Sequence, residues 1–301
     1  MSSTSPMNVH RLLEQWDIQP SKGLGQNFVV DPVILERIVA AAELAASDMV
    51  LEIGAGLGTL TERLARQAGH VVAVELDQRL LPVLQSELAA LDNVTLVEGD
   101  ILALEPVSLI EAVSAGQSGA DTPYQVVANL PYYITSAVLR HLLEARRQPR
   151  RIVVTVQREV AQRIVAQPGD MSLLAVSVQL YGRPEIRFRI KPGSFYPSPQ
   201  VESAVVRIDV HDTPPVLVEN SAFFRVVRAG FSQRRKQLHN TLTAGLRLPP
   251  DEVKEALREA GVDPRRRAQS LDIEEWARVT RALSGESPTT DLTPPNGMPG
   301  L

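Results

Sequence analysis

The sequence of 301 residues contains no cysteine. This absence excludes disulfide bonds, cysteine-based zinc sites and cysteine nucleophiles. No apolar run reaches the roughly 18 residues that a membrane-spanning helix requires, and no secretory signal is visible. We therefore expect a cytoplasmic protein that has no membrane partner.

The hydrophobic content, 44%, is sufficient for a sizeable core. Short Val/Ile/Leu runs alternate with longer amphipathic segments, a pattern that predicts an α/β fold. Near Thr213-Pro214-Pro215 the pattern changes, and the segments that follow are helical. The predicted parts are an N-terminal extension over residues 1–21, an α/β domain over 22–213, a helical domain over 214–283 and a disordered tail over 284–301.

Charge is distributed unevenly along the chain. The net charge is −4, but the last part, residues 214–301, carries 13 basic and 11 acidic side chains. Between Asn220 and Pro250 there are six basic side chains and no carboxylate, and three of the six are consecutive: Arg234, Arg235 and Lys236. Because phosphate binding depends on local patches, this segment predicts a contact with a nucleic-acid backbone. The alternative is a solvated helix face or a set of ion pairs.

A glycine-rich turn follows the first predicted buried strand, Met49–Ile53. It contains Gly54, Gly56 and Gly58 and leads into a predicted helix. Glycines allow the backbone to approach a ligand closely, and the order strand, glycine turn, helix is typical of nucleotide binding. The dinucleotide fingerprint needs a further glycine where Thr59 stands, which argues against NAD.

Acidic residues follow the next two predicted strands. Glu75 lies about 20 residues beyond the glycine turn, a position that suits a ribose diol. Asp100 could accept a hydrogen bond from an adenine amino group while Ile101 covers the ring. Each acid alone could be a solvated carboxylate. Together with Gly54, however, they form three regularly spaced strand ends that fit S-adenosylmethionine.

The tetrapeptide Asn129-Leu130-Pro131-Tyr132 follows an apolar run, so we expect it at the carboxyl end of a strand, where ligands of open α/β sheets bind. The Asn129 side-chain oxygen and the Leu130 carbonyl can accept hydrogen bonds from one planar amino group. Pro131 stiffens the turn, and Tyr132 offers a face on which a base can stack. An ordinary X-Pro turn is the alternative. Such an element resembles the catalytic motif of enzymes that methylate exocyclic amines of nucleobases.

Two loops complete the set of candidates. In the glycine-punctuated loop from Lys22 to Val29, Asn27 could bond polar ligand atoms and Lys22 could bind phosphate. In the proline-stiffened loop after Lys191, Phe195 could provide a second stacking surface opposite Tyr132. Both loops could instead be plain connections.

Together these motifs resemble the KsgA family of small-subunit ribosomal RNA adenine N6,N6-dimethyltransferases, which is related to the Erm enzymes of the large subunit. The resemblance runs from about Lys22 to Leu283. It rests on Gly-Gln-Asn-Phe, Glu-Ile-Gly-x-Gly, Glu-Leu-Asp, Gly-Asp, Asn-Leu-Pro-Tyr, Gln-Arg-Glu-Val-Ala, Phe-x-Pro-x-Pro-x-Val-x-Ser and Phe-Ser-Gln-Arg-Arg-Lys. It implies a Rossmann-like class I S-adenosylmethionine-dependent methyltransferase sheet with a small C-terminal all-α domain.

The resemblance also implies a site and a substrate. Catalytic positions would be Asn129, Leu130, Pro131, Tyr132 and Phe195. Cofactor contacts would be Asn27, Val29, Gly54, Gly56, Glu75, Asp100, Ile101 and Asn129. RNA contacts would be Lys22, Arg234, Arg235 and Lys236. The implied substrate is a pair of adjacent adenosines in a hairpin near the 3′ end of 16S rRNA, within an immature 30S particle, and we expect a monomer that uses no metal.

Two alternatives remain at this point. One is an Erm-type enzyme that modifies a single adenosine in 23S rRNA. The other is a ribosome-assembly or transcription factor that keeps the fold without the chemistry. The basic helical domain favours the small subunit, and the intact Asn-Leu-Pro-Tyr element favours catalysis.

Overall fold

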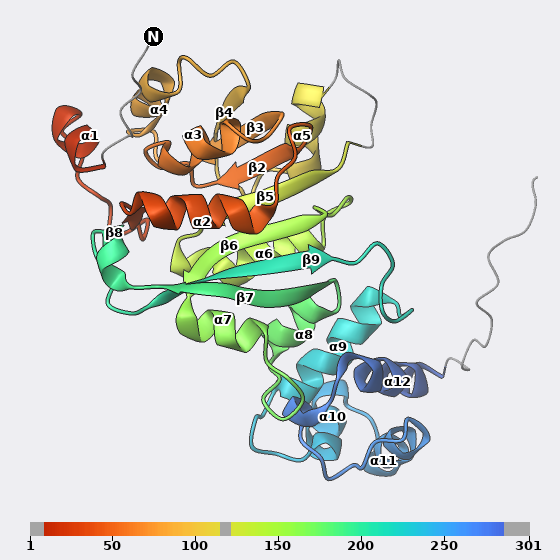
Figure 1. The fold of residues 1–301 in the computed structure, drawn as a ribbon. Coiled ribbons are helices and arrows are strands. Elements are labelled where there is room, and N and C mark those ends of the chain that lie inside the picture. The colour runs from red at the N-terminus through yellow and green to blue at the C-terminus, as the bar shows by residue number, and fades with distance from the viewer. Residues whose placement is uncertain (1–8, 115–121, 286–301) are drawn as a thin grey trace, which may run out of the picture. The chain divides into compact units, whose positions relative to one another are not determined.

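The computed structural model describes residues 9–114 and 122–285. Most of the predicted tail, and the first eight residues of the predicted N-terminal extension, therefore lie outside the described residues. The chain divides into two compact units (Figure 1). The first unit comprises Met1–Ala166 and Leu174–Pro214, and the second comprises Gln167–Leu173 and Pro215–Leu301.

A seven-stranded sheet forms the centre of the first unit, in the order β4-β3-β2-β5-β6-β9-β7. The strands are β2 (Met49–Ile53), β3 (His70–Glu75), β4 (Val94–Glu98), β5 (Tyr124–Asn129), β6 (Arg151–Gln157), β7 (Gly182–Ile190) and β9 (Ser203–Val210). Strands β2 to β6 are parallel, and β9 runs antiparallel to both β6 and β7. Strand order reverses at β2, which lies between β3 and β5, and this is the point at which such sheets bind ligands. The predicted α/β, Rossmann-like sheet is confirmed.

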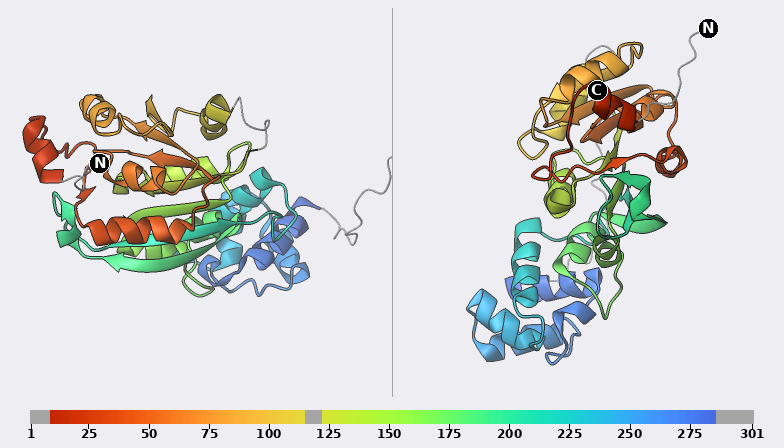
Figure 2. Two further views of the ribbon diagram at one scale, coloured as in Figure 1. Left: turned by 45° about the horizontal axis from the view of Figure 1, so that its top comes forward. Right: turned by 90° about the vertical axis from the view of Figure 1, so that its left-hand side faces the viewer.

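Helices cover both faces of this sheet, with α2 in front and α6 behind in the view of Figure 1; Figure 2 gives two further views. The helices of this unit are α1 (Val9–Gln15), α2 (Pro32–Ala42), α3 (Thr59–Ala65), α4 (Leu81–Glu87), α5 (Pro106–Ser114), α6 (Thr135–Leu143), α7 (Arg158–Ile164) and α8 (Leu173–Gln179), with short 3-10 helices at Tyr132–Ile134 and Pro192–Ser194. Because both faces are covered, every residue of β2 is buried. The Asp31 side chain caps α2 by accepting from the Val33 and Ile34 N–H groups.

A second, two-stranded sheet lies in the same unit. Strand β1 (Phe28–Val29) pairs antiparallel with β8 (Phe195–Tyr196), so that Val29 lies opposite Phe195. Both side chains are 3% exposed and belong to one hydrophobic core cluster. Sequence patterning did not predict this pairing, because two-residue strands are too short to show a period.

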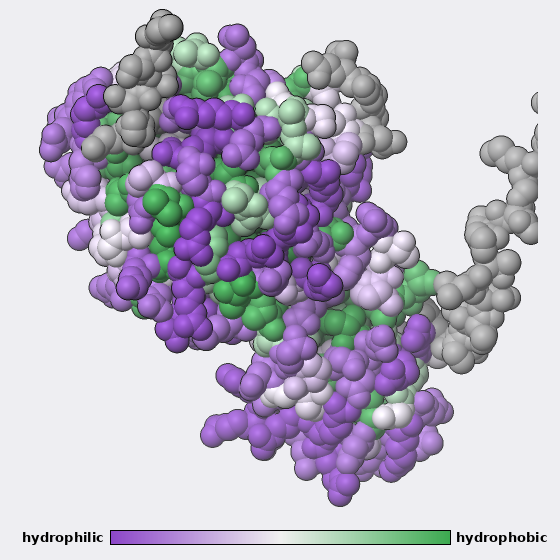
Figure 3. Space-filling model, viewed as in Figure 1, coloured by the Kyte–Doolittle hydropathy of each residue, from purple (hydrophilic) through white to green (hydrophobic). Residues whose placement is uncertain are grey.

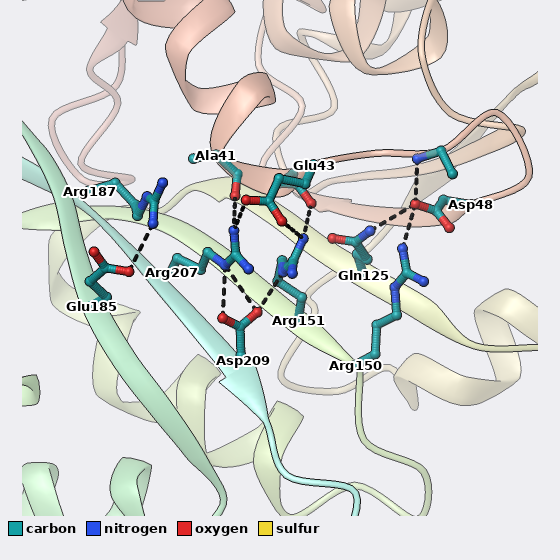
Figure 4. A network of polar contacts seen from close by, with 12 residues as sticks. Ala41, Glu43, Asp48, Gln125, Arg150, Arg151, Glu185, Arg187, Arg207 and Asp209 are labelled. Atoms are coloured by element: carbon teal, nitrogen blue, oxygen red, sulfur yellow. Dashed lines mark hydrogen bonds and ion pairs between the residues drawn. The ribbon is translucent and has the colours of Figure 1, made fainter.

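A group of ion pairs lies at the amino ends of the parallel strands, the edge of the sheet opposite to the one at which such sheets bind ligands (Figure 4). Arg151, the first residue of β6, bonds Asp209 of β9 at 2.7 Å and the Ala42 carbonyl at 2.6 Å. Arg207 bonds the same Asp209 and pairs with Glu43, the residue that follows α2. These contacts tie α2 to the antiparallel side of the sheet, away from the carboxyl ends of the strands.

The second unit is helical, as predicted, with α9 (Asn220–Phe231), α10 (Leu238–Leu246), α11 (Pro250–Glu259), α12 (Ile273–Ser284) and a short 3-10 helix at Ala268–Ser270. Trp276 is completely buried at its centre. Gly230 packs so closely that an added Cβ would lie 2.3 Å from the indole ring, which explains a glycine inside α9. The segment from 167 to 173 joins this unit through Gln269, whose carbonyl accepts from the Gly169 and Met171 N–H groups.

The face of the molecule drawn in Figure 3 is largely polar. Hydrophilic residues cover most of its coloured surface, and hydrophobic residues show in small separate groups. In the described parts of the chain, no helix combines the length and the apolar character needed to cross a bilayer.

Candidate active site

A cavity of about 800 Å³, including space open to solvent, lies at the carboxyl edge of the parallel strands. It adjoins the ends of β2, β3 and β5 and the turn that follows β4. Its walls are formed by Leu24, Gly25, Gln26, Asn27, Phe28, Ile53, Gly54, Gly56, Val74, Glu75, Leu76, Gly99, Asp100, Ile101, Asn129, Leu130, Pro131, Tyr132, Tyr133 and Ile134. The cavity therefore occupies the reversal point of the sheet, where the topology predicts a ligand.

The glycine turn adopts backbone conformations that other residues rarely tolerate. Gly54 and Gly56 have φ values of 76° and 61°. A Cβ on Gly56 would lie 3.1 Å from the Phe28 ring, and the Gly54 N–H donates to the Val74 carbonyl at 2.9 Å. Glycine is therefore needed both for the turn and for close packing beside the cavity.

Glu75 ends β3 and is held by backbone donors. Its Oε2 accepts the Gly56 N–H at 2.7 Å, and its Oε1 accepts the Asp77 N–H at 2.8 Å. Burial raises the pKa of Glu75, and these two N–H groups oppose that shift. The carboxyl group is thus fixed in position at the cavity wall, where it can accept from ribose hydroxyls.

Two aliphatic side chains stand near an acid on the next part of the wall. Leu76, directly after Glu75, is 48% exposed although it is a large hydrophobic residue, and Ile101 is 3% exposed. Asp100 accepts the Leu102 N–H through Oδ1 at 2.9 Å. An apolar surface beside a hydrogen-bond acceptor suits an adenine ring. Sequence reasoning missed Leu76, although a large apolar residue placed directly after the ribose acid was a usable signal.

The carboxamide of Asn129 is oriented by the protein itself. Asn129 is the last residue of β5, and its Nδ2 donates to the Asn27 carbonyl at 2.9 Å. Because the nitrogen is used in this way, the side-chain oxygen remains as an acceptor for a ligand amine. Leu130 and Pro131 also line the cavity, and the Pro131 φ of −56° is that of the predicted stiff turn.

The ring of Tyr132 is held by its hydroxyl group. That hydroxyl shares a hydrogen bond of 2.6 Å with the Oγ of Ser203, a fully buried residue at the start of β9. Burial raises the pKa of Tyr132, so the phenol stays neutral in the physiological range. The neighbouring Tyr133 is 63% exposed at the cavity wall and packs against Gly25. A fixed ring and an exposed ring therefore stand side by side in the chain.

Most of the predicted site residues meet in this cavity. Those that line it are Asn27, Gly54, Gly56, Glu75, Asp100, Ile101, Asn129, Leu130, Pro131 and Tyr132. Lys22 is exposed on the preceding loop and does not line the wall.

Phe195 needs correction, and the cofactor contact of Val29 stays a prediction. The side chains of both are buried in the core by the β1–β8 pairing, and neither lines the cavity. Phe195 therefore does not present the expected stacking face opposite Tyr132 in this structure. Two other aromatic residues line the cavity with Tyr132: Phe28 and Tyr133. Sequence reasoning did not predict a role for Tyr133.

Glu52 is a further acid close to the site. It lies on β2, is 1% exposed, and its pKa is raised to about 8 by burial, with a smaller contribution from the nearby Glu75. At neutral pH its carboxyl group is therefore mostly protonated, so β2 carries no full charge beneath the glycine turn.

This burial predicts a pH effect on stability. The pKa of Glu52 rises from 4.5 to about 8 on folding, so the folded chain holds an extra proton between these values. The contribution of Glu52 to the free energy of unfolding is therefore largest below pH 4.5. It decreases as the pH rises from 4.5 to about 8, because the folded chain must then hold a proton that the unfolded chain has released. Relative to wild type, Glu52→Gln should thus gain stability between pH 5 and 8, by up to about 1.4 kcal/mol for each pH unit.

Urea unfolding at several pH values measures this difference. Glu14→Gln, at an exposed position on α1, is the matched control and should follow the wild-type curve. A stability difference between Glu52→Gln and wild type that does not change with pH would contradict the assignment.

A cavity of this build, at the reversal point of a parallel sheet and with a glycine turn followed by an acid at the next strand end, defines a class I methyltransferase. S-adenosylmethionine fits its residues. The turn has no side chains that would fill the space, Glu75 can accept from a ribose, and Leu76 and Ile101 can cover an adenine.

Comparison with known proteins gives the family. Residues 19–284 match the family described as ribosomal RNA adenine dimethylase. A relative from Dehalococcoides mccartyi (strain CBDB1), named ribosomal RNA small subunit methyltransferase A, is 44% identical over 275 residues, which are 91% of this chain and 92% of the relative. A protein of the same name from Moorella thermoacetica is 43% identical over 94% of this chain and 99% of its own length.

Solved structures agree on the fold. The 23S rRNA methyltransferase ErmE is 29% identical, with a TM-score of 0.66 over 86% of this chain and 100% of that chain. A dimethyladenosine transferase from Plasmodium falciparum is 24% identical, with a TM-score of 0.72 over 84% of this chain and 95% of that chain. The chain thus belongs to the ribosomal RNA adenine dimethylase family, and it is an S-adenosylmethionine-dependent methyltransferase that acts on adenine in ribosomal RNA.

Proposed function

We propose that this enzyme dimethylates the N6 amino groups of two adjacent adenosines in a hairpin near the 3′ end of 16S rRNA, within the immature 30S particle. The observation that carries the choice of subunit is the 44% identity, over nine-tenths of the chain, to a relative named for the small subunit. The identity to the 23S rRNA enzyme ErmE is 29%.

Asn129 and Leu130 account for the chemistry. An adenine amine is a poor nucleophile, because its lone pair is delocalised into the ring. The Asn129 oxygen and the Leu130 carbonyl accept hydrogen bonds from its two N–H groups, which favours a pyramidal nitrogen with a free lone pair. S-adenosylmethionine, when bound, supplies the activated methyl group. The wall contributes positioning and charge complementarity, and the displaced proton can leave to water.

The base must leave its stack to reach this wall. Tyr132, fixed through Ser203, provides a ring on which the extruded adenine can stack, and the exposed Tyr133 can extend that surface. Stacking on an aromatic ring contributes roughly 1–3 kcal/mol per base. It therefore repays much of the cost of extruding the base.

Contacts with the RNA backbone fall to the exposed triplet Arg234, Arg235 and Lys236, in the turn between α9 and α10. Among the described residues none of the three forms an ion pair, whereas Arg265 pairs with Asp263 and Arg266 with Glu275. The triplet's charges are therefore available for phosphates. The exposed Lys22, on the loop beside the cavity, would add a phosphate contact near the target base.

We further propose that the enzyme acts as a monomer in the cytoplasm, where ribosomal particles are assembled. It would need no metal, because a donor with its own leaving group requires only orientation by Asn129 and Leu130.

Particle labelling tests the proposal. Purified 30S and 50S particles that lack the modification are incubated with the enzyme and with S-adenosylmethionine labelled in its methyl group, and the labelled base is mapped. We expect label on two adjacent adenosines of the 30S particle. Label in the 50S particle would favour the Erm-type activity, to which the ErmE likeness lends some support. Failure to bind the cofactor in calorimetry would favour a non-catalytic factor.

A further inference from the structure

Gln26, in the loop beside the cavity, has both ends of its side chain engaged. Its Nε2 donates to the Asp77 carboxylate at 2.8 Å, and its Oε1 accepts the Ser21 N–H at 2.7 Å. These two bonds connect the loop to its own first part, at Ser21, and to the segment that follows β3, at Asp77. Gln26 immediately precedes Asn27, whose carbonyl accepts the Asn129 carboxamide. Its side chain thus holds the residue that orients Asn129.

Asp77 is a rigid anchor for this contact. It is 6% exposed, and Arg79 donates to both of its carboxylate oxygens, through Nη2 at 2.6 Å and Nε at 2.9 Å. The bonds from Arg79 and Gln26 lower the pKa of Asp77, so it is ionised at neutral pH. A buried carboxylate with three side-chain donors cannot shift without breaking several bonds.

The same anchor reaches the cofactor side of the cavity. The Asp77 N–H donates to Glu75, and the other Glu75 oxygen accepts the Gly56 N–H. A continuous chain of hydrogen bonds and short backbone links therefore runs from the ribose acid, through Asp77 and Gln26, to the carboxamide that receives the target amine.

We propose that Gln26 and Asp77 are positioning residues for methyl transfer. Their contact fixes the Asn27 carbonyl and thereby sets the direction of the Asn129 side chain. Asp77 also bonds Glu75, the carboxylate assigned to the cofactor ribose, so the two parts of the site are held in a fixed relative position. This role rests on the proposed function of Asn129. It differs from that function in that neither residue touches the reacting atoms. Misplacement of a reacting group by about 1 Å can cost as much as a hundredfold in rate.

Gln26→Ala removes both side-chain contacts, and Gln26→Glu keeps an acceptor for Ser21 while placing a carboxylate against Asp77. Both should lower the rate at saturating RNA and cofactor by roughly tenfold to a hundredfold. Calorimetric affinity for S-adenosylmethionine should fall by a smaller factor than the rate, since Gln26 itself lines the cavity but Glu75 and Gly56 remain in place. Hydrogen exchange in the cofactor-free protein should quicken over residues 24–29.

The matched control is Gln78→Ala. This glutamine is exposed, follows Asp77 directly and bonds Glu98 instead of the loop. It should leave the transfer rate, the cofactor affinity and the exchange over residues 24–29 at wild-type values.

A double-mutant cycle separates positioning from general stability. Asn129→Asp lacks the donor to the Asn27 carbonyl, so adding Gln26→Ala in that background should cost at most about twofold in single turnovers. Rate reductions that multiply in the double variant, or a Gln26→Ala rate equal to wild type, would overturn the inference. Wild-type transfer to the 30S particle, measured alongside, shows separately whether the proposed function holds.

Discussion

Replacing Asn129 with alanine should reduce methyl transfer by about two to three orders of magnitude while S-adenosylmethionine still binds. The variant removes the oxygen that accepts one N–H of the adenine amine. It leaves the glycine turn, Glu75, Leu76 and Ile101 unchanged. Since the contact matters most when the nitrogen becomes pyramidal, the reduction should fall on the maximal rate, with little effect on cofactor affinity.

Single-turnover transfer to 30S particles and calorimetry with S-adenosylmethionine measure the two quantities. Asn240→Ala is a suitable control, because it removes the same side chain from an exposed position on α10 in the other unit. Near-normal turnover by Asn129→Ala would show that this residue has no part in the mechanism.

Neutralising Arg234, Arg235 and Lys236 together should weaken binding to the particle and make it less sensitive to salt. For every phosphate that is no longer neutralised by a basic side chain, the slope of log affinity against log salt concentration falls by somewhat less than one. The magnitude of this slope should therefore be smaller by roughly two to three in the triple variant than in wild type. Binding titrations with RNA or particles over a range of potassium concentrations give the slope directly.

A triple variant of equal charge provides the comparison. Lys254, Arg258 and Arg265 belong to the same unit, but each is ion-paired, with Asp251, Glu255 and Asp263 respectively. Removing these three should change the slope much less. If both triple variants behave alike, the RNA backbone does not lie along the turn between α9 and α10.

Local sequence patterns predicted the sheet well. The strand from Met49 to Ile53 ends where predicted, because a buried apolar run meets a glycine turn that cannot continue it. Irregular segments were less predictable. The apolar periodicity from Gln233 to Leu246 predicts a helix over that range, but α10 begins only at Leu238, which places the basic triplet in a turn. The Ser/Gly/Ala-rich composition from Glu111 to Thr122 predicts a surface loop, but Glu111 to Ser114 form the last turn of α5.

The hydrogen-bonding part of the cavity wall was predictable at the strand ends. Glu75, Asp100 and Asn129 meet because parallel strands bring their carboxyl ends to one edge. The features that sequence reasoning missed depend on contacts between segments far apart in the chain. The Phe195 side chain is buried because β8 pairs with β1, and the hydrogen bond from Gln26 to Asp77 joins two segments that share no sequence pattern. The burial of Glu52 also follows from the packing around β2, which its sequence neighbours do not reveal.

The helical unit is not continuous in sequence, and this affects any attempt to obtain it by truncation. A fragment that begins at Pro215 would omit the short stretch whose Gly169 and Met171 amides bond Gln269. The Gln269 carbonyl would then have neither of these donors, and the surface that the buried Met171 side chain covers would be open. An autonomous version would need residues 167–173 supplied by grafting or as a separate peptide.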